Sequence, residues 1–294
     1  MADGSRELEV VAPGVLSLVQ DLGRRGFGSA GVGRSGAADR AAFRRGGELV
    51  GNAVDAAAIE VLLGGLTARA NGELLMAVTG AASAVTVDNH GVDPARAFEV
   101  TPGAVVALGM ASRGLRSYLA FRGGIDVPPV LGSRSTDTLS AIGPAPLTAG
   151  QFLPIGSAAG FEPETNCPAT PLPDDIVTLE IVRGPRDEWF ADPEQLVSTD
   201  WQMSPRSDRV GLRLTGGRLR RSDRGRGELP SEGMVLGCLQ VPPWGEPVLL
   251  MPDHPVTGGY PVIGVVTESS MDLAAQCRPG QQLRFRWAAT LPPG

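Results

Sequence analysis

Glycine and proline interrupt this sequence so often that long regular elements are excluded. Of its 294 residues, 40 are Gly and 25 are Pro, together about 22%, whereas an average protein contains roughly 12%. Between these interruptions stand short runs rich in Val, Ala and Leu, for example residues 74–80, 84–89, 105–110 and 116–124. Short apolar runs bounded by Gly, Asn or Pro are typical of β-strands. The sequence therefore predicts many short strands joined by turns.

Helical spacing of apolar residues is found in few places. Ser35 can cap a helix that has Asp39 in its first turn and ends at residues 51–52, and residues 55–59 can form a second short helix. In the second half of the chain, helical periodicity is clear only in residues 271–276. Many strands and few helices favour a mainly β fold, a sandwich or a barrel, over a βαβ fold.

The chain also shows signs of a duplicated architecture. A turn followed by an alternating strand recurs three times, at residues 102–108, 149–153 and 279–285. A glycine that permits a positive φ, followed by such a strand, suits the hairpins of a barrel. Residues 157–175 are rich in Pro and Ala and lack periodicity, so we interpret them as a linker. We therefore predict two domains, residues 1–165 and residues 166–294.

The charged residues restrict the chemistry that the chain can perform. All 26 basic side chains are arginine, because the sequence contains no lysine. This excludes a biotinyl-lysine carrier, a Schiff-base lysine and the lysine of a P-loop, since each of them needs a primary amine. The net charge of −6 argues against nucleic acid and membranes as partners. We interpret the arginine-rich residues 218–226 as a solvated hairpin loop, and the alternative is an anion-binding patch.

The cysteines and histidines indicate a reduced compartment and no metal site. Cys167, Cys238 and Cys277 form no C-x-x-C pair, which fits a cytoplasmic protein. Only two histidines are present, and they do not combine with the cysteines at zinc-ligand spacing. No run reaches 18 apolar residues and residues 1–10 lack an apolar segment, so we expect neither export nor membrane insertion.

Two turns place arginine among groups that bind anions. In QDLGRRG, Asp21 and Arg24 flank a glycine and can hold a polar ligand, since the guanidinium is a preferred partner of carboxylates. The same pair can equally pin a loop. In LGSRST, Ser133 and Arg134 belong to a dense set of donors that could bind an anion. The alternative is a surface turn closed by local hydrogen bonds.

The densest chemistry lies in MPDHPVTGGYP, residues 251–261. His254 stands beside Asp253, and a histidine next to a carboxylate is an ordinary way to build a proton carrier near neutral pH. Gly258 and Gly259 can turn their backbone N–H groups toward a ligand oxygen. Taken separately, the two phrases could be a turn and a hairpin. Their concentration within eleven residues favours a functional site.

These phrases together resemble one family. It comprises allophanate hydrolase subunit 2, the KipA-like proteins and the C subunit of bacterial 5-oxoprolinase, and it is related to the carboxyltransferase domain of urea carboxylase. The likeness covers nearly the whole chain. It is carried by QDLGRRG with SGAAD, LVGN, AAIEVLLGG, VTGA, YLAFRGGIDVPPVLGSRST, RGP, DRVGLRLTGG, SEGMVLGCLQVPPWGEPVLLMPDHPVTGGYPVIGVV and RPGQQLRF.

The resemblance implies two tandem cyclophilin-like β-barrels with a few short helices. It implies a partner of the KipI or subunit 1 type, and a possible third, lactam-specific subunit. The expected activity is the ATP-dependent opening of 5-oxo-L-proline to L-glutamate, with ATP and Mg acting at the level of the complex and this chain inactive alone. The alternatives are a biotin-dependent carboxyltransferase subunit, with biotin on a separate carrier, and a KipA-like regulatory module that binds protein.

The resemblance also suggests roles for the site residues. Thr257 and the N–H groups of Gly258 and Gly259 would face the amide oxygen, and Asp253 or His254 would carry protons. The remaining candidates would hold an anion or line the site: Asp21, Arg24, Ser133, Arg134, Gln240 and Tyr260. The sequence departs from the family at Val256, where a second threonine is expected, and one hydroxyl contact with the ligand is thereby lost.

Overall fold

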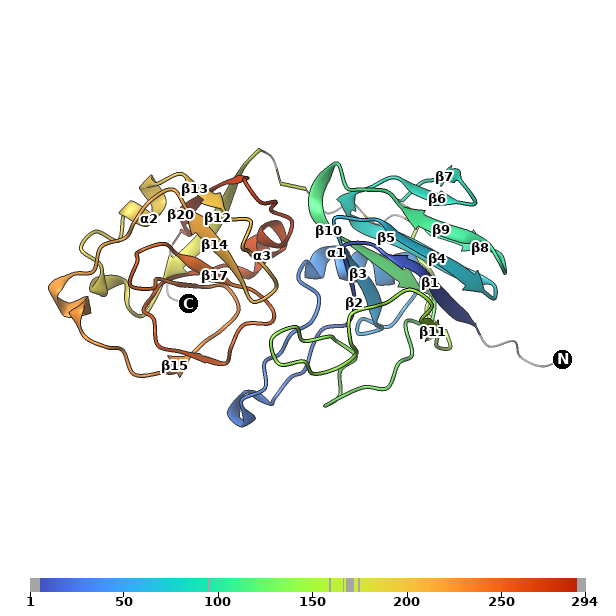
Figure 1. Cartoon of the computed structure of the whole chain (residues 1–294), viewed down its shortest axis with the longest axis horizontal. Helices are drawn as coiled ribbons and strands as arrows, with labels where there is room; N and C mark the ends of the chain where they lie inside the picture. The colour runs from blue at the N-terminus through green and yellow to red at the C-terminus, as the bar shows by residue number, and fades with distance from the viewer. Residues whose placement is uncertain are drawn as a thin grey trace. The chain divides into compact units, whose positions relative to one another are not determined.

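The computed structural model describes residues 6–94, 96–158, 160–165, 167, 172–173 and 175–289. They form two compact units (Figure 1). The first consists of the chain up to Arg24, Ser35–Asp137 and Ala141–Leu172, and the second of Arg25–Arg34, Thr138–Ser140 and the chain from Pro173. The sequence did not indicate that two short segments of the first half belong to the second unit. The boundary at residue 165 stays a prediction, and the expected linker lies partly outside the described residues.

The first unit is built from two antiparallel sheets. One has six strands, in the order β11 (Phe152–Pro154), β1 (Glu7–Pro13), β4 (Leu66–Asn71), β9 (Val105–Leu108), β6 (Val85–Val87) and β7 (His90–Val92). The other has five, in the order β2 (Leu16–Gln20), β3 (Ala58–Leu62), β10 (Arg113–Phe121), β5 (Leu74–Ala82) and β8 (Phe98–Val100). Strands such as β4 alternate buried and more exposed residues, as expected for a sheet with one solvated face.

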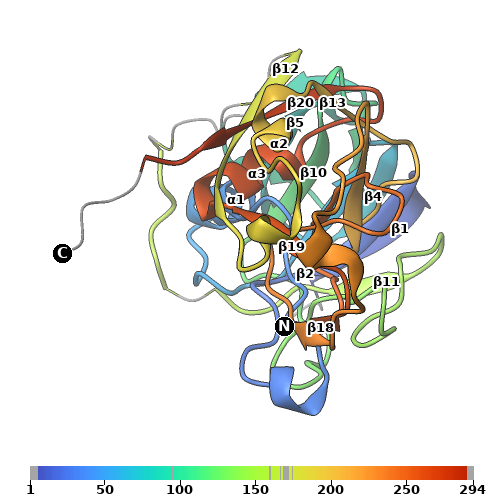
Figure 2. The same ribbon diagram turned by 90° about the vertical axis from the view of Figure 1, so that its left-hand side faces the viewer.

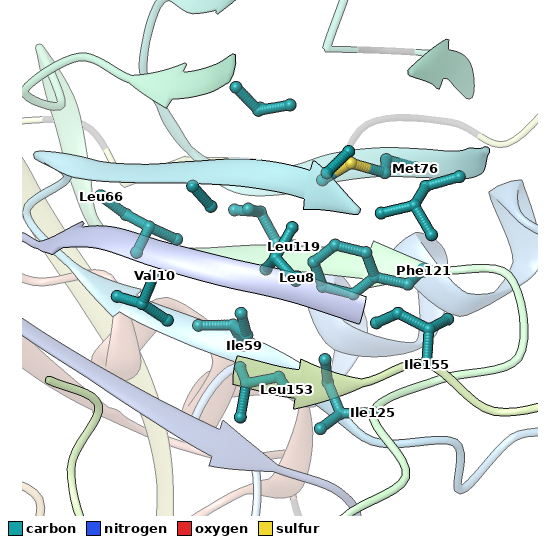
Figure 3. Packing of buried hydrophobic residues seen from close by; sticks show 14 of the residues in the cluster. Leu8, Val10, Ile59, Leu66, Met76, Leu119, Phe121, Ile125, Leu153 and Ile155 are labelled. Carbon is teal, nitrogen blue, oxygen red and sulfur yellow. The ribbon is translucent and has the colours of Figure 1, made fainter. Parts of the chain in front are cut away.

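The core of the first unit lies between these sheets. Side chains of both contribute to it, including Leu8 and Val10 of β1 and Leu119 and Phe121 of β10 (Figure 3). Strand β10 is buried along almost its whole length, because its other face packs on the helix α1 (Arg40–Leu49). A strand covered on both faces reads as a continuous apolar run rather than an alternating one.

The start of α1 differs from the sequence prediction. Asp39, not Ser35, is the N-cap, since its carboxylate accepts a hydrogen bond from the N–H of Ala42 at 2.8 Å. Ser35 has a positive φ and donates its hydroxyl to the carbonyl of Thr136 at 3.0 Å. The short helix predicted for residues 55–59 is wrong, because Ala58 and Ile59 begin strand β3. Pairing with β2 and β10 overrides a weak local helical preference there.

The second unit contains a closed barrel (Figure 2). Its strands follow the order β12 (Ile176–Arg183), β19 (Val262–Val266), β16 (Cys238–Gln240), β17 (Val248–Leu250), β14 (Gly211–Thr215), β13 (Trp201–Met203) and β20 (Gln282–Trp287). The parallel pair of β12 with β20 closes the ring. The mainly β prediction is confirmed. A closed barrel is found in this unit, whereas the described strands of the first unit form two sheets.

Short elements surround the barrel. The helices are α2 (Gln195–Ser198) and α3 (Glu268–Ala275), the 3-10 turns are η1 (Gly28–Ala30), η2 (Asp187–Trp189) and η3 (Asp223–Arg226), and a small sheet pairs β15 (Glu232–Gly233) with β18 (Thr257–Gly258). The helix predicted over residues 271–276 is confirmed by α3. Among the described residues, we find no helix long and apolar enough to cross a membrane.

Candidate functional site

Asp21 organises the loop at residues 132–136 of the first unit. Its carboxylate accepts hydrogen bonds from the hydroxyls of Ser133 and Ser135, each at 2.6 Å, and from the N–H of Arg134 at 2.5 Å. The N–H of Gly23 donates to it as well, at 2.8 Å. A buried carboxylate that holds four donors is an anchor for the loop. These contacts favour the loop-pinning interpretation of Asp21 and Ser133, and ligand binding by either residue stays a prediction.

Arg24 is buried beneath the same loop. Its guanidinium donates to the backbone carbonyl of Ser135, and at 3.3 Å to that of Ile142. A Cβ at Gly143 would collide with the carbonyl oxygen of Ser135 and lie only 2.6 Å from the Arg24 Nη2 atom, so a glycine is needed beside this contact. Only 2% of Arg24 is exposed. Binding of a substrate anion by Arg24 would require this loop to open.

Arg134 is also engaged within its own unit. Its Nε donates to the carbonyl of Val127 and its Nη2 to the carboxylate of Asp126, both at 2.7 Å. These contacts tie the loop to the segment after β10. The role of Arg134 as an anion holder stays a prediction, and it would compete with the pair to Asp126.

Asp253 forms a buried ion pair in the second unit. Its two oxygens accept from Nε and Nη2 of Arg209 at 2.9 and 3.0 Å, and the N–H and hydroxyl of Thr138 donate to Oδ2 at 3.0 and 2.7 Å. Only 1% of Asp253 is exposed. A carboxylate held by a bidentate guanidinium is stabilised as the anion. Of the two predicted proton carriers, His254 is therefore the better candidate.

His254 has a defined tautomer. Its Nδ1 lies 2.9 Å from the carbonyl oxygen of Pro255, and a carbonyl can only accept a hydrogen bond. Nδ1 must therefore carry the proton, which makes Nε2 the basic nitrogen of the neutral ring. The backbone N–H of His254 donates to the carbonyl of Met251 at 3.0 Å, which places His254 in a tight turn.

The strand pair β15–β18 carries the threonine and the first glycine of the motif. Thr257 pairs with Gly233 and Gly258 with Glu232. Gln240, at the end of β16, reaches this pair: its Nε2 donates to the carbonyl of Tyr260 at 3.4 Å. A Cβ at Gly258 would collide with that same Nε2 atom. The structure thus brings Gln240, Gly258 and Tyr260 together, and a Cβ at Gly258 would displace the amide of Gln240.

Replacing Gly258 by alanine should lower the free energy of unfolding by about 1 kcal/mol, because Gln240 must give up its hydrogen bonds. The matched change at Gly259 should cost less than about 0.5 kcal/mol, since a Cβ there meets only the Leu229 carbonyl, at 3.5 Å. Urea denaturation of both variants measures the difference. In a Gln240→Ala background, Gly258→Ala should add no further loss. Equal losses for the two glycines would contradict the assignment.

A pocket of about 510 Å³ opens beside β18. That volume falls within the range of small-molecule sites, roughly 300–1,000 Å³. Its lining comprises Arg221, Gly225, Gly227, Glu228, Leu229, Pro243, Gly259 and Tyr260. Two residues of the predicted motif, Gly259 and Tyr260, therefore border a cavity large enough for a substrate.

The pocket also contains residues that the sequence analysis missed. Arg221 was assigned to a solvated loop, and this is wrong: it is half-buried and bonds to the carbonyls of Gly225 at 3.2 Å and Val241 at 3.0 Å. Burial lowers the pKa of Arg221.

The sequence analysis also missed Arg209 and Thr138 as partners of Asp253. The arginine run itself was the only signal for Arg221, and nothing local connects Thr138 with a residue so distant in sequence.

Comparison with known proteins finds one matching family and several similar proteins. The family profile "Carboxyltransferase domain, subdomain A and B" matches residues 30–287. The chain is 37% identical to the C subunit of 5-oxoprolinase from Escherichia coli (strain K12), over 95% of this chain and 90% of that protein. It is 34% identical to the C subunit of 5-oxoprolinase from Haemophilus influenzae, over 91% of this chain and 86% of that protein.

A solved structure shares the fold. The crystal structure of the K. lactis urea amidolyase superposes with a TM-score of 0.89 at 28% identity, over 97% of this chain. The match covers 19% of the urea amidolyase, so this chain spans about a fifth of that protein's length.

Proposed function

We propose, from the premise that this chain belongs to the family of carboxyltransferase domains with subdomains A and B, that it is a subunit of an ATP-dependent 5-oxoprolinase. The observation that carries this proposal is the match to the C subunit of 5-oxoprolinase, which extends over 90% of that protein at 37% identity. The urea amidolyase, by contrast, is about five times longer than its matching part. A match along nearly the full length of both chains supports the same role in the same kind of assembly.

The proposed reaction opens the lactam ring of 5-oxo-L-proline. The oxygen of a water molecule bonds to the ring carbonyl carbon, the carbon–nitrogen bond breaks, and the nitrogen leaves with an added proton, so that L-glutamate is formed. Negative charge that develops on the carbonyl oxygen needs donors, and we assign these to Thr257 and the N–H groups of Gly258 and Gly259. We assign the proton transfer to Nε2 of His254, the basic nitrogen of its ring.

ATP and Mg are proposed to act at the level of the complex. Within the ranges that the structure covers, no three His, Cys, Asp or Glu side chains gather as metal ligands. The sequence also lacks the lysine that commonly binds nucleotide phosphates. The complex would contain a KipI-like subunit 1 protein and a possible third, lactam-specific subunit, and the ATP phosphates would be met by arginines, by backbone amides or by a lysine of a partner. This chain alone would then be inactive. Its three cysteines form no disulfide with one another, which suits the cytoplasm.

Coexpression of this chain with the two partner subunits tests the proposal. The complex should release glutamate from 5-oxo-L-proline only when ATP is supplied, and the isolated chain should release none. Glutamate formation is followed by an enzyme-coupled assay, with each subunit omitted in turn. Full turnover by the isolated chain, or no turnover by the complete complex, would contradict the proposal.

The similarity to urea amidolyase supports a second candidate, a carboxyltransferase that receives its carboxyl group from biotin. Because the chain lacks lysine, that biotin would be attached to a separate carrier protein. Carboxylation of urea by a complex that contains such a carrier, without release of glutamate from 5-oxo-L-proline, would favour this candidate.

A further inference from the structure

The position of Arg221 at the pocket wall is fixed by its surroundings. Its backbone forms an isolated β-bridge with Phe190, whose ring centre lies 5.9 Å from the guanidinium carbon. Nη1 and Nη2 each donate to one backbone carbonyl, those of Gly225 and Val241. Two carbonyls and an aromatic ring hold the plane of the guanidinium in one orientation. A preoriented guanidinium loses little entropy when it binds a ligand.

The charge of Arg221 has no acidic partner in the described part of the chain. Other arginines of the same unit pair with carboxylates: Arg183 with Glu194, Arg186 with Glu232, and Arg284 with Asp200. For Arg221 only the two backbone carbonyls act as acceptors, and its buried Nε has no hydrogen-bond partner among the described residues. A guanidinium has five N–H donors and stays charged at neutral pH. Arg221 therefore brings to the pocket a positive charge that no ion pair among the described residues neutralises.

The rest of the lining restricts which anion fits. Leu229, Pro243 and Tyr260 give the pocket apolar walls, and Glu228 contributes one exposed carboxylate. The negative charge of Glu228 opposes a highly charged anion such as a phosphate dianion more strongly than a carboxylate with a single charge. A small ring compound with one carboxylate matches both the apolar walls and the single arginine.

We propose that Arg221 binds the carboxylate of the substrate in this pocket and thereby selects a lactam acid over a neutral amide such as urea. The identity of the acid, 5-oxo-L-proline, rests on the proposed function, whereas the anion site rests on Arg221 and its pocket alone. Arg24 and Arg134, the arginines predicted from the sequence, are less suited, because only 2% of Arg24 is exposed and the Nη2 of Arg134 already donates to the carboxylate of Asp126.

Binding to the isolated chain tests the anion site independently of turnover. Dissociation constants are measured by NMR titration with three probes: 5-oxo-L-proline, 2-pyrrolidinone, which is the same lactam without the carboxylate, and inorganic phosphate. The native chain should bind 5-oxo-L-proline at least about tenfold more tightly than 2-pyrrolidinone, the value of one charged hydrogen bond. Phosphate should bind more weakly than 5-oxo-L-proline. Equal affinity for the two lactams, tighter binding of phosphate, or no binding of 5-oxo-L-proline would overturn the proposal.

Variants then assign the effect to Arg221. Arg221→Gln should weaken 5-oxo-L-proline binding about 10- to 100-fold, while binding of 2-pyrrolidinone stays within about twofold. Arg221→Lys keeps the charge but loses the two-pronged geometry and should fall between. Arg284→Gln is the matched control, since Arg284 pairs with Asp200 and is not among the pocket residues. An unchanged affinity in Arg221→Gln would overturn the assignment. The comparison of the two lactams is made on the native chain, so it does not depend on whether a variant folds.

The assembled complex separates this inference from the proposed function. If the complex turns over 5-oxo-L-proline, Arg221→Gln should raise KM about 10- to 100-fold with a smaller change in kcat. An unchanged KM would refute only the role of Arg221 and would leave the proposed function standing. If the native complex shows no turnover, the proposed function fails, while the binding experiment still decides whether Arg221 forms a carboxylate site.

Discussion

Replacing Asp253 by asparagine should lower the free energy of unfolding by about 3–5 kcal/mol, the cost of breaking a buried ion pair on one side. The side chains of Asp253 and Arg209 are 0% and 4% exposed. Asparagine keeps the shape of the side chain, but it leaves the Arg209 guanidinium buried without its anion. The substitution also replaces one carboxylate oxygen, which accepts hydrogen bonds from Arg209 and Thr138, with an NH2 group, which can only donate them. Urea denaturation followed by circular dichroism measures the loss.

The matched control is Asp200→Asn. Asp200 pairs with Arg284 through two hydrogen bonds of 2.5 and 3.1 Å, yet both side chains are about half exposed, 52% and 48%. Solvent screens such a pair, so its loss should destabilise the protein far less than the loss of the buried pair of Asp253. If the two substitutions destabilised the protein equally, burial would not be the source of the effect at Asp253.

The second large effect is expected at His254. In the assembled complex, His254→Ala should reduce kcat about 100- to 10,000-fold, the usual contribution of a general acid or base. The stability of this variant is compared with that of Asp253→Asn, because the hydrogen bond from Nδ1 of His254 to the carbonyl of Pro255 is lost. Glutamate release under saturating ATP and 5-oxo-L-proline measures kcat, and thermal unfolding reports whether the variant is folded.

The other histidine of the chain provides the control. His90 is exposed at the start of strand β7, next to a turn in which Asp88 and Asn89 have positive φ. His90→Ala should leave kcat unchanged. His254→Gln keeps a hydrogen-bonding side chain but cannot carry a proton near neutral pH, so it should be as inactive as the alanine variant. Retained activity in either His254 variant would remove this residue from the proposed mechanism.

The sequence was most informative where structure follows from local chemistry. Closely spaced Gly and Pro limit the length of any element, and the alternation in strands such as β4 follows from the two faces of a sheet. The helix α3 could be predicted for the same reason. Local preference failed at residues 55–59, where pairing of β3 with two neighbouring strands decides the conformation.

For the candidate site, too, one part could be predicted from the sequence and another part could not. The motif over residues 251–261 could be recognised in the sequence, because the residues that carry its chemistry are adjacent along the chain. The partners that define their roles are far away: Thr138 lies 115 residues from Asp253, and Arg209 lies 44 residues from it. Contacts over such separations depend on how strands and loops pack, and the sequence contains no local sign of them.

The sequence by itself determined a mainly β protein without amine side chains, and it located the segment that carries histidine, threonine and glycines. Only the tertiary structure decided that Asp253 is neutralised by Arg209, that Gln240 fills the space left by Gly258, and that Arg221 faces a pocket without an acidic partner among the described residues. Strand propensity and turns depend on neighbours in sequence. Burial and charge compensation depend on neighbours in space, which only the folded chain brings together.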